Sequence, residues 1–520
     1  MRRGERDVKD SGSEIGYIVG ESTSDYLTFV APSDIPLKKW DFVSVFIEEK
    51  EFLGRIEKVL SRSELLNEDL GYESTRKYVS RGMFDELLLC RARLLGSLVN
   101  NEIVTPRNII KPGTVVYRTS ETSLKEFFGF PEDRALLIGN LIDHDDVPVS
   151  IDVSGLRRHL AILAQTGAGK SNVAAVIMEE LLEKGASIIV LDPHADYVLM
   201  RKKSNGSFMP GSIRIFRTPL STGRYEKENK GFVDHFTINF ADLDLDSLCD
   251  IMDIREEWTN LRKIVEGIMK IPGAMRDLAS FMKATEQIPQ DERSRISGRL
   301  AFLNKIREIF SSTSTTTDEY YSPGQLSILD LSGMDQFLSN YFSYRVLQDI
   351  FEKKRQGYAG APLFIFVEEA HNFVPPGSKW HISSLIRKIA SEGRKFGMFL
   401  IVITQRPGKI DQDVLSQCNS EIIMKITNPL DQKAVLESGE SISETVIHDL
   451  PSLNVGEAIL TGEFVKFPMG VKVRRRSTLE GGGDIDIISA LRESRELRDK
   501  RFDTSANMKH VRNLMGDDSG

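Results

Sequence analysis

The sequence predicts an α/β protein of two or three domains, and three observations support that prediction. An apolar run at 160–164 leads through a Gly-rich turn into a helical pattern over 171–185. Two further apolar runs, 188–191 and 363–367, are typical of buried parallel strands, and each ends in acidic residues. Short strand-like segments come before them, and 520 residues are too many for one core. We therefore expect a parallel sheet with helices on both faces, preceded by a smaller β-domain.

The composition is that of a globular protein, with 40% hydrophobic and 28% charged residues. No apolar run approaches the ~18 residues of a membrane span, and no hydrophobic segment follows the charged amino terminus, so we expect neither a membrane anchor nor a secretory leader. The three widely spaced cysteines predict no disulfide frame or metal site and favour a cytoplasmic location. A net charge of −8 excludes a surface that is basic throughout, but not a local basic lining.

Composition and pattern divide the chain into four segments. These segments are residues 1–13, 14–130, 131–478 and 479–520. The first is charged and expected to be mobile, and the second has short strands at the spacing of a small barrel. The third is the α/β core, with a polar, Gly-rich loop expected over 205–235 and a helical insertion at about 240–312. The last begins near a glycine hinge at 481–483 and continues as a charged helix.

The strand, turn and helix at 160–185 predict a loop that binds the phosphates of a nucleotide. Backbone N–H groups and the helix N-terminus would hold the phosphates, Lys170 would reach the β and γ oxygens, and Ser171 would bind Mg²⁺. ATP with Mg²⁺ is the expected ligand. The expected nucleotide contacts are Gln165, Thr166, Gly167, Ala168, Gly169, Lys170, Ser171 and Asn172. Ala164 stands where the full signature begins with glycine, and a plain helix-capping turn is the alternative interpretation.

Acidic residues follow both buried strands. In nucleotide hydrolases with this loop, the first acid of such a pair serves the metal and the second polarises the attacking water. These roles fall on Glu368, acting on Mg²⁺ through a bridging water, and on Glu369 as the catalytic base. Asp192 ends the other strand, at the edge where α/β proteins collect their chemistry, although helix capping would also explain it.

Four more polar residues are candidates for the functional site. Three of them also have a purely structural interpretation, and one has a single expected role. Arg394 follows a helix and could serve as an arginine finger across a subunit boundary, or simply favour the helix dipole. Gln405 ends an apolar strand and could sense the γ-phosphate. Arg158 precedes the loop strand, either as part of a solvated turn or at the edge of the nucleotide site. Lys379, in a Pro/Gly loop, is either a surface lysine or a contact to DNA phosphates.

Five motifs together resemble the HerA family of the FtsK–HerA superfamily. The motifs are Gln165–Ser171, Leu191–Tyr197, Phe366–His371, Glu392–Gly397 and Thr404–Pro407. The last three, in this order and spacing, are specific to the superfamily. Ala195 and Asp196 depart mildly from the family pattern, which has glycine and glutamate there. The resemblance implies a RecA-like P-loop ATPase core, an N-terminal HAS-barrel and a C-terminal extension that braces against a neighbour.

The resemblance also implies a function. Members form homohexameric rings around double-stranded DNA and act as ATP-dependent translocases or helicases in DNA end resection, with a NurA-like nuclease and Mre11–Rad50. It makes Glu369 the catalytic glutamate and Arg394 a finger that acts in trans on the neighbour's ATP. It further implies that Arg158, Lys472 and Val473 lie near the nucleotide.

Two other functions stay open beside this one. A pump for secretion or conjugation would use the same motor, although such pumps usually carry membrane anchors or long accessory domains. A non-catalytic ring could scaffold a nuclease, but Lys170, Glu369 and Arg394 are all present and argue against that alternative.

Overall fold

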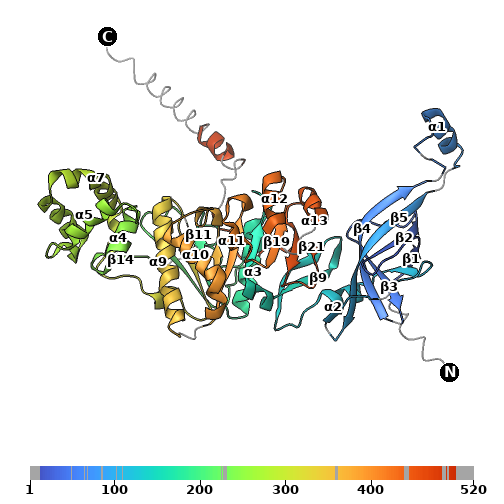
Figure 1. Cartoon of the computed structure of the whole chain (residues 1–520), viewed down its shortest axis with the longest axis horizontal. Coiled ribbons are helices and arrows are strands. Elements are labelled where there is room, and N and C mark those ends of the chain that lie inside the picture. Colours follow the sequence, from blue (N-terminus) through green and yellow to red (C-terminus); the bar gives the residue numbers. More distant parts are fainter. Residues whose placement is uncertain are drawn as a thin grey trace, which may run out of the picture.

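The computed structural model describes residues 12–498 with short gaps. The gaps are 49, 64, 67, 84–85, 101, 108, 224, 226–230, 358–360, 439–443, 483–487 and 489–490. The predicted mobile segment therefore lies almost entirely outside the described residues, as do position 483 of the predicted hinge and the tail beyond 498. The molecule is elongated, with a β-barrel at one end, the α/β core in the middle and the helical insertion at the other end (Figure 1).

The amino-terminal domain is a closed antiparallel barrel, as predicted. Its strands are β1 (Glu14–Ile18), β2 (Tyr26–Pro32), β3 (Phe42–Ile47), β4 (Lys50–Arg62), β5 (Leu87–Val99), β6 (Glu102–Val104) and β7 (Val115–Arg118). Pairing of β2 with β5 closes the sheet. Side chains of β2 alternate between the interior and the surface, as a half-buried strand requires. The β4–β5 hairpin extends beyond the barrel and carries α1 (Tyr72–Ser80) at its tip (Figure 1).

The core is one sheet, parallel at its centre and antiparallel at one side. Its order within the described residues is β13-β12-β16-β11-β17-β18-β10-β19-β20-β21-β8-β9. The strands are β8 (Ala135–Leu141), β9 (His144–Asp152), β10 (Leu160–Leu163), β11 (Ser187–Asp192), β12 (Ser212–Arg217), β13 (Val233–His235), β16 (Gln325–Asp330), β17 (Leu363–Val367), β18 (Met398–Thr404), β19 (Ser420–Met424), β20 (Glu457–Gly462) and β21 (Met469–Val473). All pairings from β13 to β19 are parallel. The α/β prediction is confirmed.

Helices cover both faces of the sheet, and further helices form the insertion at one end of the molecule (Figure 1). They are α2 (Glu121–Phe128), α3 (Lys170–Glu183), α4 (Leu245–Ile251), α5 (Thr259–Met269), α6 (Leu278–Ala284), α7 (Gln290–Lys305), α8 (Thr317–Tyr320), α9 (Gln336–Arg355), α10 (His381–Glu392), α11 (Gln412–Leu415), α12 (Pro429–Ser438) and α13 (Glu444–Asp449). Leu160 and Ile162 of β10 share a core with α3. Ala161 and Leu163 face the other core, formed with α9, α10 and the insertion helices α4–α7. A short parallel pair, β14 (Ile238–Asn239) and β15 (Phe310–Ser311), joins the two ends of the insertion.

The predicted loop over 205–235 is wrong in part. The structure places β12 and β13 there, and β12 pairs with β16 over six residues inside the sheet. Ile213 and Ile215 are buried, whereas the charged Arg214 between them forms an ion pair with Asp234. The overall polar composition of this segment predicted a loop, although its buried apolar residues alternate with polar and charged ones as in a strand.

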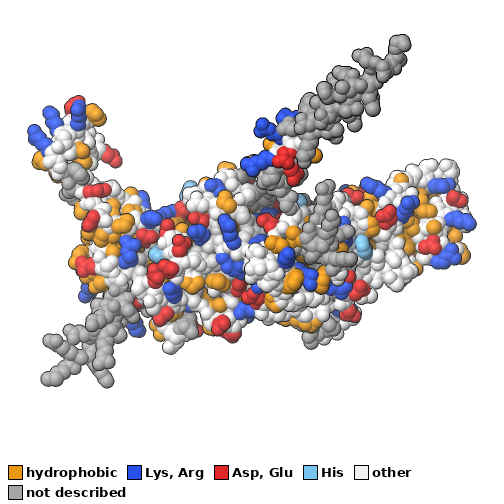
Figure 2. All heavy atoms as spheres, turned by 180° about the vertical axis from the view of Figure 1, so that it is seen from behind, with side chains coloured by type: hydrophobic (Ala, Val, Ile, Leu, Met, Phe, Trp, Pro, Cys, Tyr) orange, Lys and Arg blue, Asp and Glu red, His pale blue; other side chains and the backbone are white. Residues whose placement is uncertain are grey.

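The outer surface carries charges of both signs. On the face drawn in Figure 2, lysine and arginine side chains alternate with aspartate and glutamate, and no continuous basic track runs along it. All three cysteines are buried and free. Among the helices that the structure describes, none combines the length and the apolar character needed to cross a bilayer.

Glu421, on β19, is expected to destabilise the fold as the pH rises. Its side chain is 2% exposed, and Oε2 has no hydrogen-bond partner among the described residues. Burial raises the pKa of Glu421 from 4.5 to about 8. The folded chain thus binds this proton more tightly than the unfolded chain does. The resulting stability is full below the unfolded pKa and is lost as the pH rises from there through about 8, on the order of 5 kcal/mol in total.

The substitution Glu421→Gln keeps the shape of the side chain and removes its charge. We expect a higher midpoint of thermal unfolding at about pH 9 and little change at about pH 5. Glu126→Gln, on the exposed surface of α2, is the matched control and should change neither midpoint. Equal shifts at both pH values would contradict the assignment. Some pH dependence should remain, because burial also raises the pKa of Asp192 to about 8.

Candidate functional site

The Gly-rich loop lies between β10 and α3, as predicted. Gly167 and Gly169 have φ values of 77° and 105°, in the left-handed region that glycine tolerates best. A Cβ on Gly169 would also lie 3.3 Å from Met424. Ala164 has no such requirement, because its backbone continues the β-ladder through a 3.2 Å hydrogen bond to the carbonyl of Thr404. The departure at Ala164 therefore leaves the loop geometry intact.

The acid pair and the loop lysine meet at the carboxyl ends of β10 and β17. Lys170 Nζ lies 3.2 Å from Glu368 Oε2 and 3.0 Å from Glu369 Oε1. Burial alone would lower the pKa of Lys170, but the two carboxylates outweigh it and raise that pKa. Burial raises the pKa of Glu368, whose Oε1 accepts a hydrogen bond from the Tyr197 hydroxyl. Two buried acids are thus compensated by one lysine and one phenol.

Glu369 has one carboxylate oxygen, Oε2, without a hydrogen-bond partner among the residues that the structure describes. Its backbone is left-handed, with φ 48° and ψ 48°, which turns its side chain toward the same lysine as Glu368. His371 Nδ1 lies 3.3 Å from Oε2, but its hydrogen bond is with the Thr404 hydroxyl at 3.1 Å. Burial lowers the pKa of His371 and so disfavours the charged ring that an ion pair with Glu369 would need. Oε2 is therefore a buried acceptor available to a water molecule.

Asp192 organises the loop that follows β11. It is fully buried, and its carboxylate accepts backbone N–H groups of His194, Asp196 and Tyr197 at 3.0–3.3 Å. Asp196 in turn accepts a hydrogen bond from the Ser171 hydroxyl at 3.0 Å. The side chain of Asp192 thus holds backbone, whereas Asp196 is the acid that meets the phosphate loop. The role of Asp192 at the nucleotide stays a prediction.

Gln405 is brought to the loop from the end of β18. Its amide oxygen accepts a hydrogen bond from the Thr166 hydroxyl. Gln165 is held from the other side, because its N–H bonds to the carbonyl of Lys425 and its side chain accepts from Thr427 at 2.9 Å. The segments that follow the two strands flanking β10 therefore both hold the start of the loop. A role for Gln405 in sensing the γ-phosphate stays a prediction.

The segment after β21 runs across the start of α3. Asn172 donates to the carbonyl of Arg474 and accepts from the N–H of Arg476, both at 2.9 Å. Arg474 also pairs with Glu179 and Glu180 at 2.9 Å. Both polar ends of the Asn172 side chain are thus engaged by this segment. Asn172 can therefore contact a nucleotide only through its backbone, unless the segment after β21 moves.

Val473 and Lys472 differ in their relation to the loop. The N–H of Val473 bonds to the carbonyl of Gly456, and the N–H of Gly456 bonds to the carbonyl of Ala168. Val473 is therefore two hydrogen bonds away from the loop. The Lys472 side chain is exposed and lies 3.5 Å from Asp145, on the β8–β9 hairpin. Contact of either residue with a nucleotide stays a prediction.

Arg158 and Arg394 lie at the edge of the sheet opposite the phosphate loop. They precede β10 and β18, which are adjacent and parallel, with Leu160 beside Ile401. Arg158 pairs with Glu463 at 2.6 Å, and Arg394 is exposed on a 3₁₀ turn (Gly393–Phe396). Contact of Arg158 with a nucleotide stays a prediction, because Arg158 lies before β10 and the loop of its own chain lies after it. Because the loop follows the carboxyl end of β10, the loop and the two arginines lie at opposite edges of the sheet.

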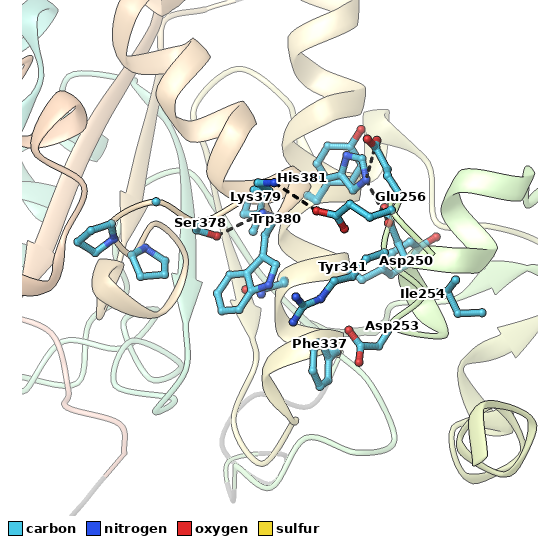
Figure 3. Close-up of a pocket in the computed structure, with 18 residues that line it drawn as sticks. Asp250, Asp253, Ile254, Glu256, Phe337, Tyr341, Ser378, Lys379, Trp380 and His381 are labelled. Atoms are coloured by element: carbon cyan, nitrogen blue, oxygen red, sulfur yellow. Dashed lines mark hydrogen bonds and ion pairs between the residues drawn. The ribbon is translucent and has the colours of Figure 1, made fainter. Parts of the chain in front are cut away.

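Lys379 lies at the boundary between the core and the insertion. It borders a cavity of about 640 Å³, formed by the α4–α5 loop, α9 and the Pro/Gly loop before α10 (Figure 3). Its side chain is 85% exposed and lies 3.3 Å from Glu257 of the insertion. His381 beside it bonds to Asp250 at 3.2 Å, and that bond raises the pKa of His381. Contact of Lys379 with DNA stays a prediction.

Comparison with known proteins identifies the family. The family described as "Helicase HerA, central domain" matches residues 136–350. The DNA double-strand break repair helicase HerA of Pyrococcus furiosus is 31% identical, over 78% of this chain and 82% of the relative. This chain belongs to the HerA family. A probable helicase of Methanocaldococcus jannaschii is 30% identical over 98% of this chain and 99% of the relative. VirB4 of Thermoanaerobacter pseudethanolicus aligns with a TM-score of 0.46 at 15% identity, over 66% of this chain and 98% of that one.

The resemblance to HerA that the motifs predicted is thus confirmed. Sequence reasoning nevertheless assigned no role to three residues of the site in this HerA-family chain. They are Tyr197, which holds Glu368; Asp196, which bonds to Ser171; and His371, which lies beside Glu369. All three stand inside the motifs at 191–197 and 366–371. Their position shortly after a buried strand is the signal that could have identified them. Residues there lie at the carboxyl edge of the sheet, where the phosphate loop also lies.

Proposed function

We propose that this HerA-family chain is an ATP-dependent translocase, or helicase, that moves on double-stranded DNA as a homohexameric ring. The observation that carries the proposal is the position of Lys170 Nζ within 3.2 Å of both Glu368 and Glu369. A cation that bridges a metal-binding acid and a general base lies where the γ-phosphate of ATP must enter. The helicase names of the two relatives support DNA as the track.

The residues present fit a magnesium nucleotide. Ser171 offers a hydroxyl and Glu368 a carboxylate, and Asp196 lies 3.0 Å from that hydroxyl, which are the oxygen ligands that Mg²⁺ prefers. Bound there, Mg²⁺ would supply positive charge against the β and γ phosphates. Lys170 exchanges its two carboxylates for phosphate oxygens, and Glu369 is then free to take the proton of the attacking water through Oε2.

A ring completes the site. Arg394 and Arg158 lie at the edge of the sheet opposite their own phosphate loop, so that each chain offers a loop on one side and cations on the other. Head-to-tail contacts of this kind generate closed rings. A hexamer is the proposed closure, with DNA in the centre, where Lys379 would contact backbone phosphates and make binding sensitive to salt.

The Pyrococcus furiosus relative is a DNA double-strand break repair helicase, which supports a place for this chain in double-strand break repair. For this chain we propose DNA end resection, with a NurA-like nuclease as the partner and Mre11–Rad50 acting in the same process. A ring that drives double-stranded DNA toward a nuclease needs no sequence readout, because the phosphate backbone is the same along its length.

ATP turnover with and without duplex DNA tests the proposal. We expect duplex DNA to stimulate turnover and Lys170→Ala to abolish both the basal and the stimulated rate. Lys184→Ala, at the other end of α3, is the matched control and should keep both rates. An ATP turnover rate that does not change when duplex DNA is added would favour a pump for secretion or conjugation. Turnover that survives Lys170→Ala would overturn the site itself, and a protein that holds a nuclease without any turnover would favour the scaffold.

A further inference from the structure

His159 is a buried histidine at the edge of the sheet that carries Arg158 and Arg394. It directly follows Arg158, begins the turn into β10, and is 2% exposed. Its Nδ1 accepts the N–H of Leu400 at 2.9 Å, so Nε2 carries the proton and donates it to the carbonyl of Ala390, also at 2.9 Å. Both ring nitrogens are therefore used, and the neutral Nε2–H tautomer is the one that satisfies both bonds.

The two partners of this ring flank the turn that carries Arg394. Ala390 lies in the last turn of α10, where helix carbonyls lack partners of their own. Leu400 lies in β18, where its N–H faces the position just before the first residue of β10. One side chain thus ties together the end of α10, the start of β18 and the start of β10. Residues 391–399, with Arg394, are held at both ends by His159.

The backbone of His159 shows that the side chain is required here. Its φ of 61° and ψ of 161° fall in a region that glycine occupies and other residues avoid. Glycine would relax the turn but could make neither hydrogen bond. A strained residue persists where its surroundings over-determine it, and such residues gather at functional sites.

We propose that His159 is a positioning residue, which sets the turn of Arg394 against Arg158 so that one subunit presents both cations to the nucleotide of the next. The proposal rests on the trans role of Arg394 proposed above. His159 itself touches no nucleotide, and it acts through the two hydrogen bonds that fix the turn. A finger displaced by about 1 Å loses much of its effect on the transition state, since hydrogen bonds to the phosphate need defined geometry.

Burial lowers the pKa of His159 to about 4, and the charge of Arg394 acts in the same direction. The ring therefore stays neutral at working pH and keeps its one donor and one acceptor. A charged ring would have two donors and would lose the bond from Leu400, so the clamp depends on the neutral form.

Three variants test the clamp. His159→Gly removes both hydrogen bonds and relieves the backbone strain. It therefore distinguishes an effect of the lost side chain from an effect of the strain. His159→Asn keeps an acceptor for Leu400, but its NH2 group is on a shorter side chain than Nε2 and does not reach the carbonyl of Ala390. Val346→Ala, in α9, controls for a general loss of packing. We expect at least a tenfold lower kcat in His159→Gly, with nucleotide affinity within about twofold, and an intermediate kcat in His159→Asn. Thermal unfolding shows that each variant is folded.

Mixed rings separate positioning from a general defect. His159→Gly keeps an intact phosphate loop, and Lys170→Ala keeps an intact finger, so co-expression should restore turnover well above either variant alone. Unchanged kcat in His159→Gly would overturn the inference. So would the absence of rescue in a mixture with Lys170→Ala when Arg394→Ala is rescued under the same conditions. Absence of rescue for Arg394→Ala as well would instead remove the proposed trans finger, and the inference with it.

Discussion

Glu369→Gln is expected to lower the rate of ATP hydrolysis by about 10²–10⁴-fold, the range that a general base contributes. Glutamine can still accept a hydrogen bond from Lys170 through its amide oxygen, so the architecture should persist. It cannot take a proton from the attacking water, which Oε2 of Glu369 is placed to do. Nucleotide affinity should stay close to that of the unmodified protein. Single-turnover hydrolysis and equilibrium nucleotide binding measure the two quantities separately.

Glu368→Gln is the matched control for this prediction. Like Glu369→Gln, it removes one negative charge from beside Lys170, and the side chain that it changes is also buried. We expect it to weaken binding of the magnesium nucleotide, because this carboxylate is the one assigned to the metal. Turnover at saturating magnesium should fall less than in Glu369→Gln. Equal losses of saturated turnover in both variants would contradict the assignment of the base to Glu369.

Arg394→Ala is expected to have the second large effect, a loss of about 10³–10⁵-fold in kcat, as for an arginine finger. The reason is electrostatic. The guanidinium would stabilise charge that develops on the phosphate in the transition state and little of it in the ground state. Steady-state ATPase assays should therefore show the loss in kcat rather than in KM. Lys395→Ala removes an exposed cation from the same turn and should leave kcat within about threefold.

Co-expression decides whether the finger works in trans. Arg394→Ala subunits keep the phosphate loop and Lys170→Ala subunits keep the finger, so a mixed ring contains some complete sites. Turnover of the mixture should exceed that of either variant alone. A mixture as inactive as its components would place Arg394 outside the neighbour's site, and the two edges of the sheet would then need another explanation.

Some of the site could be predicted because its constraints are local. Gly167 and Gly169 supply the left-handed backbone of a phosphate loop, and an apolar strand directly before them is read from neighbouring residues. The same holds for Glu368 and Glu369, whose position at the end of a buried strand demands compensation by a cation. The closed barrel and the parallel sheet followed from strand spacing and apolar runs. The strand β12 did not, because Arg214 interrupts its apolar pattern.

Other features depend on which strands become neighbours, and the sequence alone does not settle that. The sequence by itself determined the phosphate loop and the acid pair, since each is written within a few consecutive residues, and it indicated the family through the order and spacing of five short motifs. Only the tertiary structure decided that Lys170 compensates both acids and that Arg158 lies at the edge of the sheet opposite its own loop. It also decided that His159 bonds to Ala390 and Leu400, more than two hundred residues later. The physical reason is the order of the sheet. Parallel pairing of β10 with β18 places the residues before both strands at one edge and the residues after them at the other.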